Sequence, residues 1–345
     1  MSSLTVSNKK LIKEYYDKIY GATPENIGEL LSPYFSKDTI FDCSHPINNI
    51  TGFDNMIEQF WKPFMRSFPD AVKRPYIFTG GQSIRGDEDP KFENAHWVVS
   101  NGYYEATFAE DFLDIPASKG IVFLRFCECS MIEDGKIVLT RLLIDLLDLM
   151  RQVGIIFFNA LGNDSFIPGP YSFDGIKLGE GDPETSLASI QLIEDMCFKG
   201  LNSFEEGGYE GMGLSRYFKE DFTWYGPCGI GICKGLKGFE DNHQIPWLNS
   251  FPDRENANFF ASIGDDNYAF VGGWPSMYAT HKGSDFLGIP ATGVKLDMRC
   301  IDWWRVEDGK IVENWVNLDI IHILYQMGYD VFDRIRKGRY YFNRR

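Results

Sequence analysis

Both halves of the chain begin with apolar residues at helical spacing. An i, i+3, i+4 pattern is typical of a helix that buries one face. The residues with this spacing are Leu11, Tyr15 and Ile19 in the first half and Leu187, Ile190, Ile193, Cys197 and Leu201 in the second. A second helical stretch follows in each half, at residues 55–68 and 239–251, and ends at a Phe-Pro-Asp sequence. Because proline interrupts helices, we expect both stretches to end there.

The remainder of each half carries strand patterns. Residues 95–108 and 268–280 are rich in aromatic and β-branched residues, and residues 294–300 alternate between apolar and polar. Asp134-Gly135 and Asp308-Gly309 each lie between two such runs, where they predict tight hairpin turns. Helices followed by a meander predict an α+β domain in which helices pack on one face of a curved antiparallel sheet.

The same pattern occurs twice because the chain contains two copies of one domain. Residues 112–154 and 286–328 align without gaps at an offset of 174 and share 15 identities, among them Asp145 with Asp319. A period this long indicates independent domains rather than a stack of short repeats. Residues 163–175 and 179–183 are rich in glycine and proline, as linkers are. We therefore predict domains at residues 1–160 and 184–345, joined by a linker at 161–183.

Composition narrows the classes of partner. A net charge of −15 and a pI near 4.8 argue against a nucleic acid partner, because phosphates repel an acidic protein. No apolar run has the length of a membrane span, and the N-terminus lacks the apolar block of a signal peptide, so we expect a cytoplasmic protein without membrane association. The seven cysteines lack metal-ligand spacing. We expect free thiols, no metal and no cofactor.

The last strand of each copy holds the first candidate site. Side chains two apart share a face of a strand. In the second copy, one face carries Val312, Asn314, Val316 and Leu318, and the other carries Glu313, Trp315, Asn317 and Asp319. The first face suits packing against helices, whereas the second places an amide beside a carboxylate, as expected for a polar site in a cavity. The second face in the first copy has Leu139, Arg141, Leu143 and Asp145.

This comparison predicts that only the second copy kept an active site. Its two histidines, His243 and His281, align with Phe60 and Thr107 of the first copy. Together with Asp319 they form a set that can move protons near neutral pH. The alternative is that Asp319 caps the helix that follows it, as aspartate often does. Indole rings that can stack on a flat substrate are those of Trp247, Trp274 and Trp315.

The second copy resembles the SnoaL-like polyketide cyclase family, also called predicted ester cyclases, of the nuclear-transport-factor-2-like superfamily. The resemblance rests on residues 238–253 with His243 and Phe251-Pro252-Asp253, on residues 280–293 with His281 and Gly288-Ile289-Pro290-Ala291, and on residues 308–328 with Trp315 and Asp319. It implies a cone-shaped α+β barrel around one apolar pocket, and a cofactor-free aldol closure with an aspartate as acid and base. Asp319 matches the position of that aspartate.

The resulting hypothesis is a cofactor-free acid–base enzyme that acts on a small apolar or ring-forming carbonyl substrate in the C-terminal cone. We expect its catalytic residues to be Asp319, His281 and His243, and its substrate-binding residues to be Asn317, Trp315, Trp247 and Trp274. The alternative is a non-enzymatic small-molecule binding protein. In either case two copies in one chain can pack sheet to sheet as an intramolecular pseudo-dimer, with further homo-oligomerisation left open.

Overall fold

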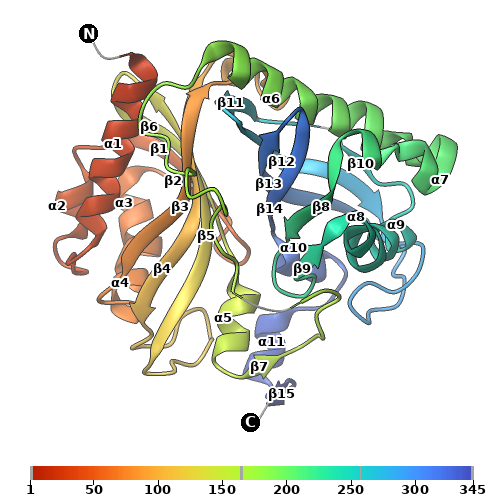
Figure 1. The fold of residues 1–345 in the computed structure, drawn as a ribbon. Helices are drawn as coiled ribbons and strands as arrows, with labels where there is room; N and C mark the ends of the chain where they lie inside the picture. The colour runs from red at the N-terminus through yellow and green to blue at the C-terminus, as the bar shows by residue number, and fades with distance from the viewer. Residues whose placement is uncertain (1–2, 164–165, 257, 343–345) are drawn as a thin grey trace.

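The computed structural model describes residues 3–163, 166–256 and 258–342. It consists of two curved sheets that face each other, with helices on the outer side of each sheet (Figure 1). The predicted fold class, α+β with two tandem cones, is confirmed. The proposed linker at residues 161–183 falls between the last strand of the first unit and the first helix of the second.

The first unit has a sheet of strand order β2-β1-β6-β5-β4-β3. Its helices are α1 (Leu4–Ile19), α2 (Ile27–Leu31), α3 (Phe53–Met56), α4 (Lys62–Ser67) and α5 (Leu146–Gln152), and a π-helical turn, Ile57–Trp61, joins α3 to α4. Its strands are β1 (Phe35–Cys43), β2 (Asn49–Thr51), β3 (Val72–Gln82), β4 (His96–Thr107), β5 (Ile121–Glu133), β6 (Lys136–Ile144) and, outside this sheet, β7 (Ile155–Ile156).

The second unit repeats this plan with the order β10-β12-β13-β14-β8-β9, and β11 also pairs with β12. Its helices are α6 (Pro183–Asp195), α7 (Phe204–Met212), α8 (Gly235–Phe239), α9 (Ile245–Ser250), α10 (Ile320–Gln326) and α11 (Val331–Arg336), and a π-helical turn, Glu240–Gln244, joins α8 to α9. Its strands are β8 (Phe218–Tyr225), β9 (Ile232–Lys234), β10 (Glu255–Asn256), β11 (Ala261–Asp265), β12 (Tyr268–Thr280), β13 (Lys295–Glu307) and β14 (Lys310–Leu318). The last strand, β15 (Tyr341–Phe342), returns to pair with β7 of the first unit.

The hairpin turns have the predicted conformation. Asp134 and Gly135 have φ values of 47° and 70°, and Asp308 and Gly309 have values of 51° and 69°. Positive φ at both central residues matches the twist of the flanking strands, and glycine adopts it without strain. These turns hold β5 against β6 and β13 against β14.

Each sheet also contains a strand that the sequence pattern did not reveal. β1 and β8 lie between the helices of their copies and pair in parallel with β6 and β14, so each sheet is mixed rather than wholly antiparallel. In β1 the polar sequence Lys37-Asp38 is exposed in the middle of the strand, which hides its alternation. These strands extend the surface on which the helices pack.

Two apolar cores result from this arrangement. The first comprises the residues that pack the helices of both units against their sheets. The second lies between the two sheets, where Trp97 of the first copy and Trp303 and Trp315 of the second are fully buried. Polar contacts join the copies at the margin of the second core. The Lys9 ammonium lies 2.6 Å from the Asp265 carboxylate, and the Ile84 N–H donates to the Ser262 carbonyl at 2.9 Å. The copies therefore pack sheet to sheet.

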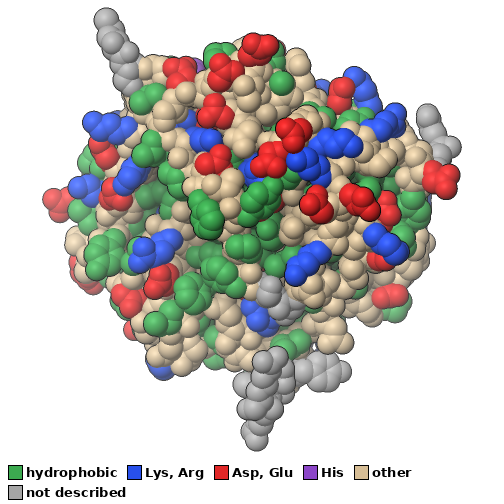
Figure 2. Space-filling model, viewed as in Figure 1, with side chains coloured by type: hydrophobic (Ala, Val, Ile, Leu, Met, Phe, Trp, Pro, Cys, Tyr) green, Lys and Arg blue, Asp and Glu red, His purple; other side chains and the backbone are tan. Residues whose placement is uncertain are grey.

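The surface mixes charges with apolar groups. On the face shown in Figure 2, acidic and basic side chains are interspersed among hydrophobic ones. Among the helices that the structure describes, none combines the length and the apolarity needed to cross a bilayer.

Candidate active site

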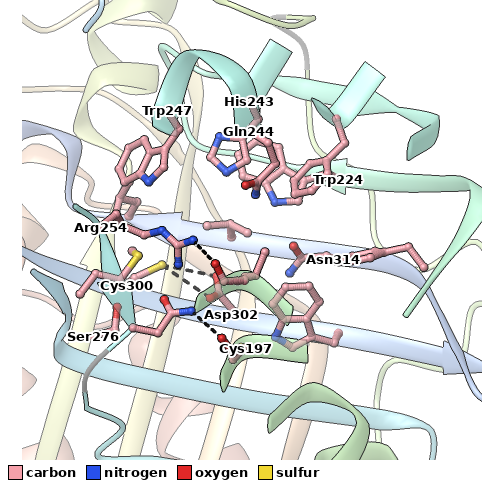
Figure 3. Close-up of a pocket in the computed structure, with 18 of the residues that line it drawn as sticks. Cys197, Trp224, His243, Gln244, Trp247, Arg254, Ser276, Cys300, Asp302 and Asn314 are labelled. Carbon is pink, nitrogen blue, oxygen red and sulfur yellow. Dashed lines mark hydrogen bonds between the residues drawn. The ribbon is translucent and has the colours of Figure 1, made fainter. Parts of the chain in front are cut away.

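The second unit contains a cavity between its sheet and its helices. The space between its walls, counting the part that is open to solvent, is about 720 Å³. Figure 3 shows its polar and aromatic side chains facing a common space. The principal lining residues are Cys197, Trp224, His243, Gln244, Trp247, Arg254, Asn256, Cys300, Asp302, Trp304, Asn314, Val316 and Leu318.

Strand periodicity and a π-helical turn position these side chains. Cys300, Asp302 and Trp304 share one face of β13, and the alternating residues of β14 from Asn314 to Leu318 share the corresponding face. Opposite them, the turn Glu240–Gln244 brings His243 to the cavity. The wider hydrogen-bonded ring of a π turn is frequent at functional sites.

Asp302 is the one carboxylate among the lining residues. The only hydrogen bonds that its carboxylate makes to described residues come from the Cys300 thiol, at 3.5 and 3.6 Å, and no described lysine or arginine forms an ion pair with it. Burial disfavours the charged form and raises the pKa of Asp302 to about 7. The group can therefore accept a proton and return it near neutral pH.

His243 faces the same cavity as a neutral base. Its ring stacks on Trp224 with centroids 4.1 Å apart and lies 5.8 Å from the ring of Trp247. Burial lowers the pKa of His243 to about 3, with a smaller contribution from Arg254. A neutral imidazole offers one donor and one acceptor nitrogen. His243 can therefore hydrogen-bond to a substrate oxygen without carrying charge.

Other polar atoms on the wall lack partners. The Asn314 amide nitrogen donates to the Trp303 carbonyl at 3.0 Å, but its side-chain oxygen accepts no hydrogen bond from a described residue. Arg254 donates from one terminal nitrogen to the Leu201 carbonyl at 2.8 Å, while its Nε has no partner among the described residues. Buried polar atoms are normally paired, so unpaired ones beside a cavity are suited to a ligand.

The corresponding space in the first unit is filled. Glu128 of β5 lies opposite Leu142, just as Asp302 of β13 lies opposite Val316, so Glu128 and Asp302 are equivalent. Glu128 forms a fully buried ion pair with Lys73, whose ammonium lies 3.8 Å from the centre of the Tyr16 ring. The buried rings of Phe60 and Phe64 stand where the second copy has His243 and Trp247.

The predicted site residues separate into two groups. His243 and Trp247 line the cavity. Asn317 and Asp319 line a smaller space of about 330 Å³ between the two units, together with Asp145. Trp274 and Trp315 lie on the face that packs against the first sheet. The expectation that Trp315, Asn317 and Asp319 border the cavity is wrong, because the cavity lies on the helix-facing side of β14.

Asp319 caps a helix and bridges the two units. Its carboxylate accepts from the N–H of His322 at 3.1 Å, which caps α10, and from the N–H of His45 in the first unit at 2.9 Å. Asp145 is arranged in the same way, with the N–H of Asp148 at 3.1 Å and that of Cys228 at 2.8 Å. Asp319 also pairs with the Arg299 guanidinium at 3.3 Å. Helix capping thus accounts for part of the contacts of both residues, while a catalytic role for Asp319 stays a prediction.

His281 lies in the core beside the cavity rather than on its wall. Its Nδ1 accepts from the Thr292 N–H at 3.3 Å, and its ring lies 5.4 Å from that of Phe251. The N–H of His281 donates to the Val294 carbonyl, as that of Phe108 does to Gly120. His281 is thus equivalent to Phe108 and not to Thr107, because β4 and β12 differ by one residue in their spacing to the following loop. These contacts indicate that His281 anchors the loop at residues 281–294.

Asp302 and Arg254 line the cavity but are not among the site residues predicted from the sequence. The apolar alternation of Leu296, Met298 and Cys300 continues with period two to Asp302, which places a carboxylate on an apolar face. That signal was available. Arg254 directly follows the Phe-Pro-Asp sequence, where no periodic pattern assigns it to a face.

The part of the chain that forms most of the cavity wall also matches a known protein family. Residues 214–327, which span β8 to β14 and α10, match the family model described as SnoaL-like polyketide cyclase. The second copy is a SnoaL-like domain. In this SnoaL-like domain, the matched region supplies most of the cavity wall, including His243, Asp302 and Asn314. No curated protein matched the chain.

Three solved structures that resemble the chain each cover less than half of it. A protein from Jannaschia sp. CCS1, provisionally named a SnoaL-like polyketide cyclase, is 17% identical, with 44% of this chain and 95% of that chain covered and a TM-score of 0.34. IdmH from Streptomyces antibioticus, provisionally named a polyketide cyclase, is 23% identical, with 40% and 96% covered and a TM-score of 0.32. An NTF2-like protein from Burkholderia thailandensis is 15% identical, with 40% and 96% covered and a TM-score of 0.32.

Proposed function

We propose that the SnoaL-like domain is a cofactor-free acid–base enzyme that closes a ring by aldol addition within one carbonyl substrate. One observation carries the proposal: Asp302 lies in a largely apolar cavity with no cation paired to it among the described residues, and burial raises its pKa to about 7. Such a carboxyl group has the proton affinity that a base and acid needs near neutral pH. The match to the SnoaL-like family supports the same class of reaction.

The reaction needs two proton transfers and one new carbon–carbon bond. The Asp302 carboxylate removes a proton from a carbon next to a carbonyl, and the electron pair moves onto the carbonyl oxygen as an enolate. The enolate carbon then attacks a second carbonyl of the same molecule, and the resulting alkoxide takes the proton back from Asp302. Neutral donors at His243 and Gln244 are placed to hydrogen-bond to the developing oxyanion.

The cavity walls suit a flat substrate. Trp224, Trp247 and Trp304 present indole rings to the cavity, and such rings bind planar ring systems by stacking and burial of apolar surface. Holding both carbonyls in one small space also replaces an encounter between molecules by a preset geometry. The filled first unit then has a supporting role, because its sheet covers the face of the catalytic sheet that is opposite the cavity.

A simple carbon acid tests this proposal without the natural substrate. The α-protons of 2-tetralone, a bicyclic ketone, exchange with D₂O, and proton NMR measures the rate. We expect the wild-type protein to accelerate this exchange and Asp302→Asn to lower the acceleration by about 10²-fold or more, the usual range for a proton-transfer group. Asp319→Asn is the matched comparison, because Asp319 is the other candidate and its carboxylate lies outside the cavity.

The binding-protein alternative predicts a different outcome. It is favoured by the same cavity and its unpaired polar atoms, which suit a ligand whether or not chemistry follows. In that case the wild-type protein would bind ring compounds but leave the exchange rate at the buffer value. A loss of exchange in Asp319→Asn with none in Asp302→Asn would instead move the acid–base role to Asp319.

A further inference from the structure

Arg254 is a buried cation on the cavity wall that pairs with no acidic side chain among the described residues. Its residue is 7% exposed, and its guanidinium forms no ion pair with a described carboxylate. One terminal nitrogen of the guanidinium donates to the Leu201 carbonyl, and the Nε has no partner among the described residues. In Figure 3 the side chain reaches from the side of Trp247 toward that of Asp302.

Two other buried arginines pair with carboxylates, whereas a third, Arg125, donates to the backbone carbonyls of Tyr225 and Gly226. Arg305 is buried, and its Nε lies 2.6 Å from the Glu313 carboxylate. Arg141, also buried, pairs with Asp42 at 3.3 Å and with Glu88. A buried charge is costly unless a counter-charge compensates it. Arg254 differs from Arg125 in lining the cavity, where a ligand can supply the counter-charge.

Asp302 does not supply the missing charge. Its short side-chain contacts are to Cys300, and burial keeps a large fraction of it protonated at neutral pH. The first copy offers a control within the chain. Alignment through the Ser-Phe-Pro-Asp sequences places Ala71 opposite Arg254, so the guanidinium is present only in the copy with the cavity.

We propose that the cavity binds a ring compound bearing a carboxylate, and that the carboxylate pairs with the guanidinium of Arg254. Planar guanidinium groups match carboxylates through parallel N–H···O bonds. One arginine balances a singly charged carboxylate, whereas a phosphate dianion requires more cations than the described wall offers. The apolar part of the ligand then contacts the indole rings. This inference rests on the proposed function for the identity of the site and adds its substrate class, a carbonyl-containing ring acid.

The test compares acids with their neutral amides. The probes are benzoate with benzamide and 2-naphthoate with 2-naphthamide, at about pH 6, where most of Asp302 is protonated. Quenching of tryptophan fluorescence reports on the cavity because three indoles line it, and calorimetry checks the affinity. We expect at least one acid to bind about tenfold or more tightly than its amide, as a charge-assisted pair provides.

Three variants assign the preference to the guanidinium. Arg254→Gln should abolish the preference for the acid while leaving amide binding within about threefold, because about 0.6 kcal/mol separates such affinities. Arg254→Lys should retain part of it, since it keeps the charge but loses the planar fork. Arg216→Gln, an exposed arginine of the same domain, should change neither.

Two results would overturn the inference. One is a wild-type protein to which no acid of the series binds more tightly than its amide, including the case in which none binds. The other is an acid preference that persists in Arg254→Gln. If Arg254→Gln does not fold, the affinities of wild type and Arg254→Lys for each acid and its amide still test the inference. Asp302→Asn should keep the acid preference while losing proton exchange, so the inference and the proposed function can fail separately.

Discussion

Asp302 and Glu128 occupy equivalent positions in β13 and β5, but of the two only Glu128 forms an ion pair with a described residue. In the first unit Lys73 pairs with the glutamate, and aromatic rings surround the ammonium. In the second unit the position of Lys73 is taken by Asn256, and the carboxyl faces a cavity. One duplicated position thus serves as a structural ion pair in one copy and as the candidate acid and base in the other.

Breaking the ion pair should destabilise the protein. Glu128→Gln leaves the Lys73 ammonium buried without a counter-charge, for which we expect a loss of about 3–5 kcal/mol in the free energy of unfolding. Urea denaturation measures it. Replacing both partners, Lys73→Met with Glu128→Leu, should cost less than Glu128→Gln alone, since no charge stays buried. Equal stability of Glu128→Gln and wild type would contradict the role assigned to this pair.

Asp302 should make stability depend on pH in a defined direction. The pKa of an unfolded aspartate is about 3.9, and burial raises that of Asp302 to about 7, so the folded state binds the proton more tightly. The stability from this group is fully present below about pH 4 and is lost as pH rises through about 7. Asp302→Asn should therefore gain stability relative to wild type between about pH 5 and pH 8. A difference between the two proteins that does not change with pH would refute the raised pKa.

The strand-end aspartates should tolerate asparagine. Asparagine caps helices about as well as aspartate, so Asp145→Asn should change the free energy of unfolding by less than about 1 kcal/mol. Asp319→Asn keeps the cap but loses the ion pair with Arg299, which should cost up to about 1 kcal/mol more. Asp319→Ala should cost about 1–2 kcal/mol or more, because it also removes the acceptor for the N–H of His45. Thermal unfolding of the three variants measures this order. A large loss of activity with intact folding in Asp319→Asn would return Asp319 to the catalytic role predicted from the sequence.

His243 has a natural counterpart that lacks its chemistry. His243→Phe introduces the residue that the first copy carries at Phe60, and the ring can keep its stacking on Trp224. We expect folding stability to be retained and α-proton exchange to fall about tenfold or more through loss of one hydrogen bond to the oxyanion. NMR exchange rates and thermal unfolding together separate the two effects. Unchanged exchange would exclude His243 from the reaction.

Much of the fold follows from local signals in the sequence. The duplication, the helical stretches and the Asp-Gly turns depend on neighbouring residues, and all correspond to elements of the structure. The face of β14 that borders the cavity does not follow from them. Alternation shows that Asn314 and Asn317 lie on opposite faces, but only the packing of the second sheet on the first decides which face is covered by helices.

The site residues show the same limit. The sequence distinguishes the copies at His243, because the first copy has phenylalanine at the aligned position. His281 looked equivalent in sequence, yet its contacts are with Thr292 and Phe251 in the core. Arg254 was missed because the absence of a counter-charge is a property of three-dimensional packing, which no spacing rule records.

The pH dependence of α-proton exchange tests the central claim most directly. With wild-type protein and 2-tetralone, we expect the catalysed rate to rise with pH through an apparent pKa near 7, as Asp302 ionises. The same rise of the rate with pH should be present in Asp319→Asn and absent in Asp302→Asn. A pH-dependent rise that persists in Asp302→Asn, or that disappears in Asp319→Asn, would contradict the assignment of Asp302 as the acid and base of this domain.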